Sequence, residues 1–299
     1  MLILRFEFEK TFMREIKLNR LQIQMKKATS LLYTADYEES KIILDKLLLT
    51  YLSDHDVHGI LRCYYRLAFI SYARGEIEQF TDYTERYNAL FTSFLAKDIE
   101  FYIEQNMLLG LQAMSNLKYS RAIPFLSSVV THSSPKYKKY KISALLFIQN
   151  CQLTLGNIEQ AEIINEQLRE YEASMQGHTQ QIIQLYLNRA YTYYLLEDDE
   201  NLETLIAEIK SHPDISLLTK ETIFLSILKA KHLGRKGEYI KAINDLESIL
   251  NTYNKMRDPQ LLYMIYSALI EYYEQIQNHK EALYFAKLLM ALERELSLH

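Results

Sequence analysis

The stretch GEYIKAI at residues 237–243 decides the interpretation of this sequence, because two relatives of it occur earlier in the chain. GNIEQAE occupies residues 156–162 and GEIEQFT occupies residues 75–81, so the glycines that open the three stretches are 81 residues apart. The residue two positions after each glycine marks a phase, and weaker copies of the pattern lie between the three. The seven markers are Tyr37, Ile77, Tyr119, Ile158, Asn201, Tyr239 and His279. Seven copies spaced by about 40 residues indicate an internal repeat.

Each repeat contains two helical patterns. In the last repeat, Leu262, Ile265 and Leu269 recur at intervals of three and four residues, and Phe285 and Leu289 do the same after the marker. Glycine in the polar break ends the first helix, because it adopts a left-handed conformation without strain. A mostly small residue three positions after the marker is expected to let the two helices approach closely. These residues are Ser40, Phe80, Ala122, Ala161, Thr204, Ala242 and Ala282.

Proline marks the outer boundaries of the repeats. Pro135, Pro213 and Pro259 fall between units, where a helix stops or starts. Pro124 lies inside the second helix of the third unit, which predicts a shortened first turn or a local kink. An N-terminal extension with the start of the first helix is expected at residues 1–19, followed by one repeat domain at 20–299. Its units are expected near residues 20–54, 55–96, 97–134, 135–176, 177–213, 214–257 and 258–299.

The composition narrows the class of protein. Only 7 glycines and 4 prolines in 299 residues favour long helices over strands, which need frequent turns. A formal net charge of −4 disfavours nucleic acid as a partner. Cys63 and Cys151 are too few for a disulfide framework or a zinc site, which indicates a reducing compartment. The apolar run at residues 259–270 is too short to span a bilayer, so a cytoplasmic protein without membrane insertion is predicted.

The repeat resembles the tetratricopeptide repeat (TPR) superfamily over about residues 20–297. The residues that carry the resemblance are Leu109-Gly110 with Tyr119 and Ala122; Tyr266, Leu269, Tyr273 and Ala282; and, in part, Tyr64, Leu67, Ala68 and Gly75. The resemblance implies an all-α, right-handed superhelical solenoid of about seven helical hairpins. The family period is 34 residues, and a period near 40 matches HEAT or armadillo repeats on length alone. The elbow favours TPR with each helix about one turn longer.

Long, degenerate repeats of this kind are similar to those of bacterial signalling proteins. One such group is the peptide-sensing regulators of the Rap and PlcR type, and another is the sensory half of some diguanylate cyclases. Residues 1–20 are too few for the helix-turn-helix domain of the peptide-responsive transcription factors, and no GGDEF motif occurs. The resemblance therefore implies a class of protein and not an activity.

In the family, the groove is lined by the first helix of each unit. The corresponding positions in units two, four, five and six of this sequence select a set of residues. Asparagine can bond a peptide backbone, and arginine can hold a carboxylate with two hydrogen bonds. The alternative is that these are ordinary surface or packing residues, as most of the 24 tyrosines are expected to be. The selected residues are Arg62, Tyr65, Phe69, Tyr72, Leu146, Asn150, Tyr186, Arg189, Tyr193 and Lys231.

Three polar clusters allow other interpretations. DHDVH at residues 54–58 has the ligand types of a metal site, but a polar turn between units explains it equally. PKYKKYK at 135–141 could bind nucleic acid or an acidic protein, or form a solvated helix start. LEDDENLE at 196–203 has carboxylates suited to acid–base chemistry, but negative charge also suits a helix N-terminus. No metal or cofactor site is predicted from them.

The predicted function is a non-catalytic binding module that holds a peptide or protein segment in a concave groove, in bacterial signalling or regulation. The alternative is a sensory or dimerisation module of a larger protein whose effector domain follows residue 299. The C-terminal helix around Leu289 and Leu292 is amphipathic and offers a surface for a homodimer or a following domain. An enzyme on a helical scaffold is the third hypothesis, and no catalytic residue is proposed for it.

Overall fold

The computed structural model describes residues 2–94, 98–252 and 258–297, and these residues form helices and turns without any strand. The first seven α-helices are α1 (Leu2–Tyr33), α2 (Tyr37–Ser53), α3 (Val57–Ala73), α4 (Ile77–Phe94), α5 (Ile99–Ser115), α6 (Tyr119–His132) and α7 (Lys138–Thr154). The others are α8 (Ile158–Arg169), α9 (Thr179–Leu195), α10 (Asp199–Ser211), α11 (Thr219–Arg235), α12 (Tyr239–Thr252), α13 (Pro259–Gln275) and α14 (His279–Ser297). Short 3-10 helices are η1 (Pro135–Tyr137), η2 (Glu172–Met175) and η3 (Ile215–Leu217). The all-α class predicted from the sequence is therefore confirmed.

The turn between the two helices of each pair has one recurring geometry. A residue in the left-handed region, with φ between 56° and 80°, lies two positions before the second helix begins. The next residue donates its backbone N–H to the carbonyl five positions back, as Glu76 does to Ser71 at 2.8 Å. This is the Schellman end of a helix, which satisfies carbonyls that the helix leaves unpaired. The left-handed residues are Ala35, Gly75, Leu117, Gly156, Glu197, Gly237 and Gln277.

Six of the seven sequence markers are the first residue of a helix, and the fifth is displaced. The fifth left-handed residue is Glu197, so the equivalent position is Asp199 and not Asn201. The contact residue of this pair is therefore Leu202, which is fully buried, while Thr204 is exposed. The prediction for Thr204 was wrong because residues 197–201 are all polar, so the sequence there allows more than one phase. The other six predicted contact residues are buried.

Pro124 does not shorten α6, which runs without interruption from Tyr119 to His132. Proline removes one backbone donor from the helix, and the loss falls only five residues after the helix start. The predicted shortened first turn is therefore absent. The side chains that α6 buries, Ala122, Leu126 and Val129, follow the three-to-four spacing of a helix with one apolar face.

Odd- and even-numbered helices differ in how much of their surface is covered. Each odd-numbered helix from α1 to α11 contacts the next odd-numbered helix as well as the helix that follows it in the chain. The odd-numbered helices from α1 to α13 are called the inner series below. In α3, every side chain from Gly59 to Ala73 except that of Arg62 is buried. The even-numbered helices bury one stripe, such as Phe80, Thr84 and Tyr87 in α4. Burial on all sides explains why α3 lacks a clear polar face.

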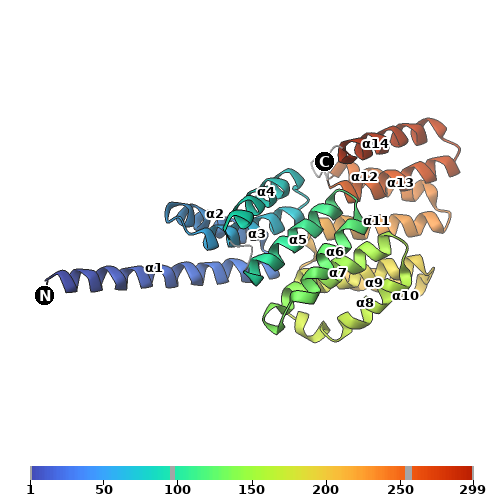
Figure 1. Cartoon of the computed structure of the whole chain (residues 1–299). Helices are drawn as coiled ribbons and strands as arrows, with labels where there is room; N and C mark the ends of the chain where they lie inside the picture. Colours follow the sequence, from blue (N-terminus) through green and yellow to red (C-terminus); the bar gives the residue numbers. More distant parts are fainter. Residues whose placement is uncertain (1, 95–97, 253–257, 298–299) are drawn as a thin grey trace.

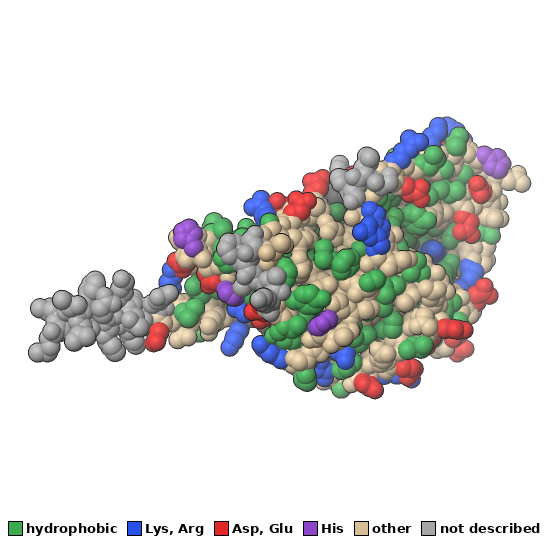
Figure 2. Space-filling view, in the orientation of Figure 1, with side chains coloured by type: hydrophobic (Ala, Val, Ile, Leu, Met, Phe, Trp, Pro, Cys, Tyr) green, Lys and Arg blue, Asp and Glu red, His purple; other side chains and the backbone are tan. Residues whose placement is uncertain are grey.

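The inner series also makes contacts between distant parts of the chain. Helix α13 contacts α5, and α1 contacts α9, where the rings of Tyr33 and His178 stack with centroids 4.8 Å apart. Figure 1 shows the resulting body, from which the beginning of α1 projects at one end, while α12 to α14 lie at the other. Figure 2 shows acidic and basic side chains mostly along the rim of this body. The inner helices therefore surround an interior built by several repeats.

Candidate functional site

Side chains from six helices of the inner series meet around one cavity, called the inner cavity below. Residues of α3, α5, α7, α9, α11 and α13 line it, and its empty volume is about 480 Å³, including space open to solvent. Its apolar walls include Tyr72, Met114, Phe147, Leu187, Phe224 and Leu261. Its polar lining consists of Asn150, Gln180, Gln184, Lys220, Glu221 and Gln260. Apolar walls with a few convergent polar groups are typical of a ligand site.

A buried ion pair stands at the edge of this cavity. The Lys220 Nζ atom lies 2.7 Å from Asp258 Oδ2, and the two side chains are 14% and 2% exposed. Asp258 also caps α13 by accepting the backbone N–H of Leu261 at 3.1 Å. Burial alone would lower the pKa of Lys220, but the Asp258 carboxylate and Tyr72 outweigh it and raise that pKa. The Lys220 ammonium also lies 4.1 Å from the centre of the Tyr72 ring, a cation–π contact.

Glu221 is the charged group of the cavity that the ion pair does not balance. Its side chain is 4% exposed, and its Oε2 atom has no hydrogen-bond partner in the described part of the chain. Burial raises the pKa of Glu221, although its own backbone N–H, Lys220 and Gln180 act in the opposite direction. The same carboxylate contributes, after burial, to raising the pKa of Tyr37 in α2.

Two amides close the cavity between distant helices. Gln260 Nε2 of α13 donates to Asn150 Oδ1 of α7 at 3.1 Å, across 110 residues of sequence. The other atom of each amide, Asn150 Nδ2 and Gln260 Oε1, has no hydrogen bond within the described ranges. Gln184 Nε2 of α9 donates to Asn188 Oδ1 at 2.9 Å, which leaves the Gln184 oxygen available. These amide groups can donate to and accept from a peptide backbone.

Of the residues predicted to line a groove, Tyr72 and Asn150 line the inner cavity. Tyr65 and Phe69 are buried in a smaller pocket between α1, α3 and α7. Leu146 is buried, and its carbonyl accepts a hydrogen bond from Asn188 at 2.9 Å. The inner helices cover these side chains from several sides, because contacts between non-neighbouring repeats close the space that an open groove would leave.

The remaining predicted residues lie outside both pockets. Arg189 donates to Glu172 at 3.0 and 3.3 Å and to Asn165 at 3.1 Å, which fixes η2 against α8 and α9. Arg62 of α3 binds Glu100 of α5 at 3.2 Å. The guanidinium groups predicted to hold a ligand carboxylate are therefore engaged within the chain.

Three further predicted residues pack on the outside of the inner cavity. Tyr186 and Tyr193 of α9 are half-buried against the core. The Lys231 ammonium lies 5.5 Å from the centre of the Tyr194 ring, and burial lowers the pKa of Lys231. None of the three is among the residues that surround the cavity.

A second buried charge cluster lies next to the smaller pocket. Glu104 of α5 is completely buried, accepts the Tyr140 hydroxyl at 2.7 Å and lies 3.5 Å from Arg66 of α3. Tyr87 adds a longer hydrogen bond to the same carboxylate at 3.4 Å. Burial raises the pKa of Glu104 to about 7, although Arg66 and Tyr140 act in the opposite direction. This cluster connects α3, α4, α5 and α7.

The lysine tract 135–141 forms η1 and the start of α7, and its ammonium groups face tyrosine rings. Lys139 lies 4.1 Å from the centre of Tyr33, and Lys138 lies 5.2 Å from that of Tyr171. Lys136 and Lys141 make similar contacts with Tyr137 and Tyr171 at 4.9 and 5.8 Å. Within the described ranges these four lysines have no ion pair with a carboxylate, so the tract is a cationic surface.

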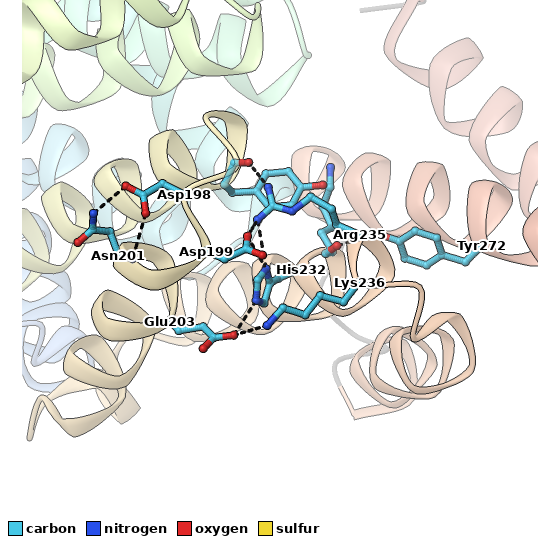
Figure 3. Close-up of polar contacts among 10 residues, drawn as sticks. Asp198, Asp199, Asn201, Glu203, His232, Arg235, Lys236 and Tyr272 are labelled. Atoms are coloured by element: carbon cyan, nitrogen blue, oxygen red, sulfur yellow. Dashed lines mark hydrogen bonds and ion pairs between the residues drawn. The ribbon is translucent and has the colours of Figure 1, made fainter.

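The acidic tract 196–203 has a structural role in the turn before α10 and on its first turns (Figure 3). Asp198 caps the helix by accepting the backbone N–H of Asn201. Asp199 binds Arg235, and Glu203 binds Lys236 and lies 3.0 Å from the ring of His232. These pairs join α10 to α11, as Figure 3 shows. Asp198, Asp199 and Glu203 thus have partners within the chain at a helix start.

The tract 54–58 contains the turn between α2 and α3 and the first two residues of α3. His55 has a left-handed backbone with φ of 54°, Asp56 caps α3 through Gly59, and Asp54 pairs with Lys17 at 2.6 Å. The described residues contain no group of three or more potential metal ligands. No helix in the described ranges is long and apolar enough to cross a membrane.

Sequence reasoning missed Lys220, Glu221 and Gln260, which supply half of the polar lining of the inner cavity. Each lies at the start of a first helix, directly before the buried apolar stretches of α11 and α13. A Lys-Glu pair at the start of a helix, directly before a long apolar stretch, is the sequence signal that could have indicated Lys220 and Glu221. Comparison with protein-family models found no match, and comparison with curated proteins found no significant similarity.

Proposed function

We propose that this chain is a non-catalytic binding module that holds a peptide or protein segment between the helices of its inner series. In this proposal the helical pairs form a right-handed, TPR-like superhelical solenoid. Two observations support it: left-handed elbow residues recur every 39 to 42 positions, and helices alternate between inner and outer positions. Repeats of this kind bury a continuous core by stacking and present a shared inner surface.

The observation that carries the proposal is the inner cavity. Six helices contribute to it, and Asn150 and Gln260 leave amide groups available there for a peptide backbone. Tyr72 and Phe224 provide rigid aromatic area at low entropic cost, which suits recognition of a peptide. The cavity is narrow, so we expect it to take a side chain or a chain terminus while the rest of the ligand lies outside.

A role in bacterial signalling or regulation fits this arrangement. A ligand in the cavity contacts α3, α7, α11 and α13 at once, so it favours the arrangement of helices that brings these contacts together. Binding thereby couples repeats that are far apart in the sequence. A coupling of this type is what a sensory module requires to transmit occupancy to another surface.

The test is to fill the cavity and measure binding. Gln184→Trp places a large ring at the cavity wall, and Ala207→Trp places the same ring on the exposed face of α10 as a matched control. Peptides are selected from a random library on the unmodified chain, and their affinities are measured by calorimetry. We expect Gln184→Trp to weaken binding by about tenfold or more and Ala207→Trp to leave it unchanged. Equal affinities in the two variants would exclude the cavity as the binding site.

A second candidate function is association through α14. This helix exposes Leu283, Tyr284 and Met290, each more than half exposed, and it packs on α13. Leu289 and Leu292 are half-buried beside them. An exposed apolar face on a helix favours contact with a second copy or another domain. Sedimentation velocity of the chain and of Leu283→Glu tests this: a dimer that the substitution abolishes supports it, and a monomer in both excludes self-association.

A further inference from the structure

We infer that the inner cavity binds a primary ammonium group of its ligand, with the Glu221 carboxylate as the acceptor. The inference rests on the proposed function and adds the chemistry of the ligand to it. The relevant group is either the N-terminal amine of a peptide or the side chain of a lysine.

The first argument is the unpartnered oxygen. Glu221 lines the cavity, is 96% buried, and its Oε2 atom accepts no hydrogen bond from the described residues. A buried acceptor without a donor destabilises the folded state, and it does so more strongly when it is charged. An ammonium supplies three N–H donors, of which one would satisfy Oε2. Gln184 and Gln260 also line the cavity, and their side-chain oxygens can accept further N–H groups of the ligand.

The second argument is the balance of charge. Lys220 of α11 and Asp258 at the start of α13 neutralise each other at 2.7 Å. Tyr72 of α3 lines the cavity and Tyr37 of α2 lies near Glu221, and both carry hydroxyl groups that are neutral at ordinary pH. In its ionised form Glu221 leaves one negative charge among the residues that line the cavity, which matches one positive charge on the ligand and repels an anion.

The third argument distinguishes an ammonium from other cations. A guanidinium is planar and holds its five N–H donors in a fixed arrangement, so it needs more space than an ammonium, and the cavity is narrow. A divalent metal ion needs several oxygen, nitrogen or sulfur ligands, and the described residues contain no cluster of three acidic, histidine or cysteine side chains. A compact ammonium with flexible donors fits a single acceptor flanked by amide oxygens.

The experiment uses the full chain and three capped or uncapped tripeptides as probes, followed by saturation-transfer NMR and calorimetry. Acetyl-Gly-Lys-Gly-amide carries the side-chain ammonium, and Gly-Gly-Gly-amide carries only the N-terminal one. Acetyl-Gly-Gln-Gly-amide is the neutral control. We expect at least one charged probe to bind at millimolar concentration and the neutral probe to bind about tenfold more weakly or not at all. Which charged probe binds identifies the source of the ammonium.

Variants of the chain assign the binding to Glu221. Glu221→Gln keeps the shape and removes the charge, and we expect it to weaken the charged probe by about tenfold or more. Glu200→Gln, on the exposed surface of α10, should change the affinity less than about twofold. If Glu221→Gln does not fold, Glu221→Met takes its place, and the comparison of probes on the unmodified chain decides independently.

Three results would overturn the inference: no binding of either charged probe, equal binding of the neutral probe, or full affinity in Glu221→Gln. If neither charged probe binds to the folded chain, only water occupies the position beside Oε2. Library peptides that bind in the cavity but carry no free ammonium would leave the proposed function intact while this inference fails.

Discussion

Replacing Asp258 by asparagine tests whether the ion pair of the inner cavity is as buried as its geometry indicates. Asparagine keeps an oxygen that can cap α13 through the Leu261 N–H, so the cap is retained. The Lys220 ammonium, 14% exposed, then lacks its partner at 2.7 Å. Leaving a buried charge uncompensated costs about 3–5 kcal/mol, and the residual exposure places the expected loss near the lower end, at about 3 kcal/mol.

The double variant Lys220→Met with Asp258→Asn separates the ion pair from general disruption. Replacing both charges by uncharged groups of similar volume removes the buried charges, so its cost should fall to about 1 kcal/mol. Urea unfolding followed by far-UV circular dichroism measures both variants. Glu238→Gln, which breaks an exposed pair with Lys241, is the control and should leave the unfolding midpoint unchanged. A loss below about 1 kcal/mol for Asp258→Asn would refute a desolvated pair at this site.

Further predictions concern side-chain packing between helices, the hydrogen bonds of Arg189 and the pH dependence of stability. Gly110→Ala places a Cβ atom 2.7 Å from Leu126, so overpacking should outweigh helix propensity and lower stability by about 1 kcal/mol in a thermal melt. Ala242→Trp should cost about 1–3 kcal/mol by the same assay, because Ala242 is fully buried. Arg189→Ala should lower stability by about 1–3 kcal/mol but leave peptide affinity in calorimetry unchanged. Burial raises the pKa of Glu104 from 4.5 to about 7, so folding stability should fall between these pH values as pH rises, and Glu104→Gln should flatten urea midpoints measured across that range.

The positions of the helices could be predicted because the elbow geometry is local. A left-handed residue two positions before the second helix sets the phase, and Gly75, Gly156 and Gly237 signal it directly in the sequence. Where the left-handed residue is Glu197, no glycine gives the signal, and the marker was placed two residues too late. The elbows at Ala35, Leu117 and Gln277 also lack glycine and were placed correctly, so the error at Glu197 follows from the run of polar residues 197–201, which allows more than one phase.

The candidate site could be predicted only in part, because it depends on contacts between distant helices. Tyr72 and Asn150 were selected from helix phase, which is a property of a single repeat. Lys220 and Gln260 reach the same cavity only because α11 and α13 come back against α3 and α7. Helix periodicity contains no information on that closure. The smaller pocket with Tyr65 was likewise predicted as exposed groove and is enclosed by α1.

The contacts between Lys220 and Tyr72 and between Gln260 and Asn150 also restrict how the gene can change. In an open array each repeat contacts only its neighbours, so a unit can be duplicated or deleted at low cost. Here the two contacts join helices separated by several repeats. A duplication between α7 and α11 would move both pairs of residues out of reach of each other. The copy number of this segment is therefore fixed by its interior, and divergence within it should proceed by substitution.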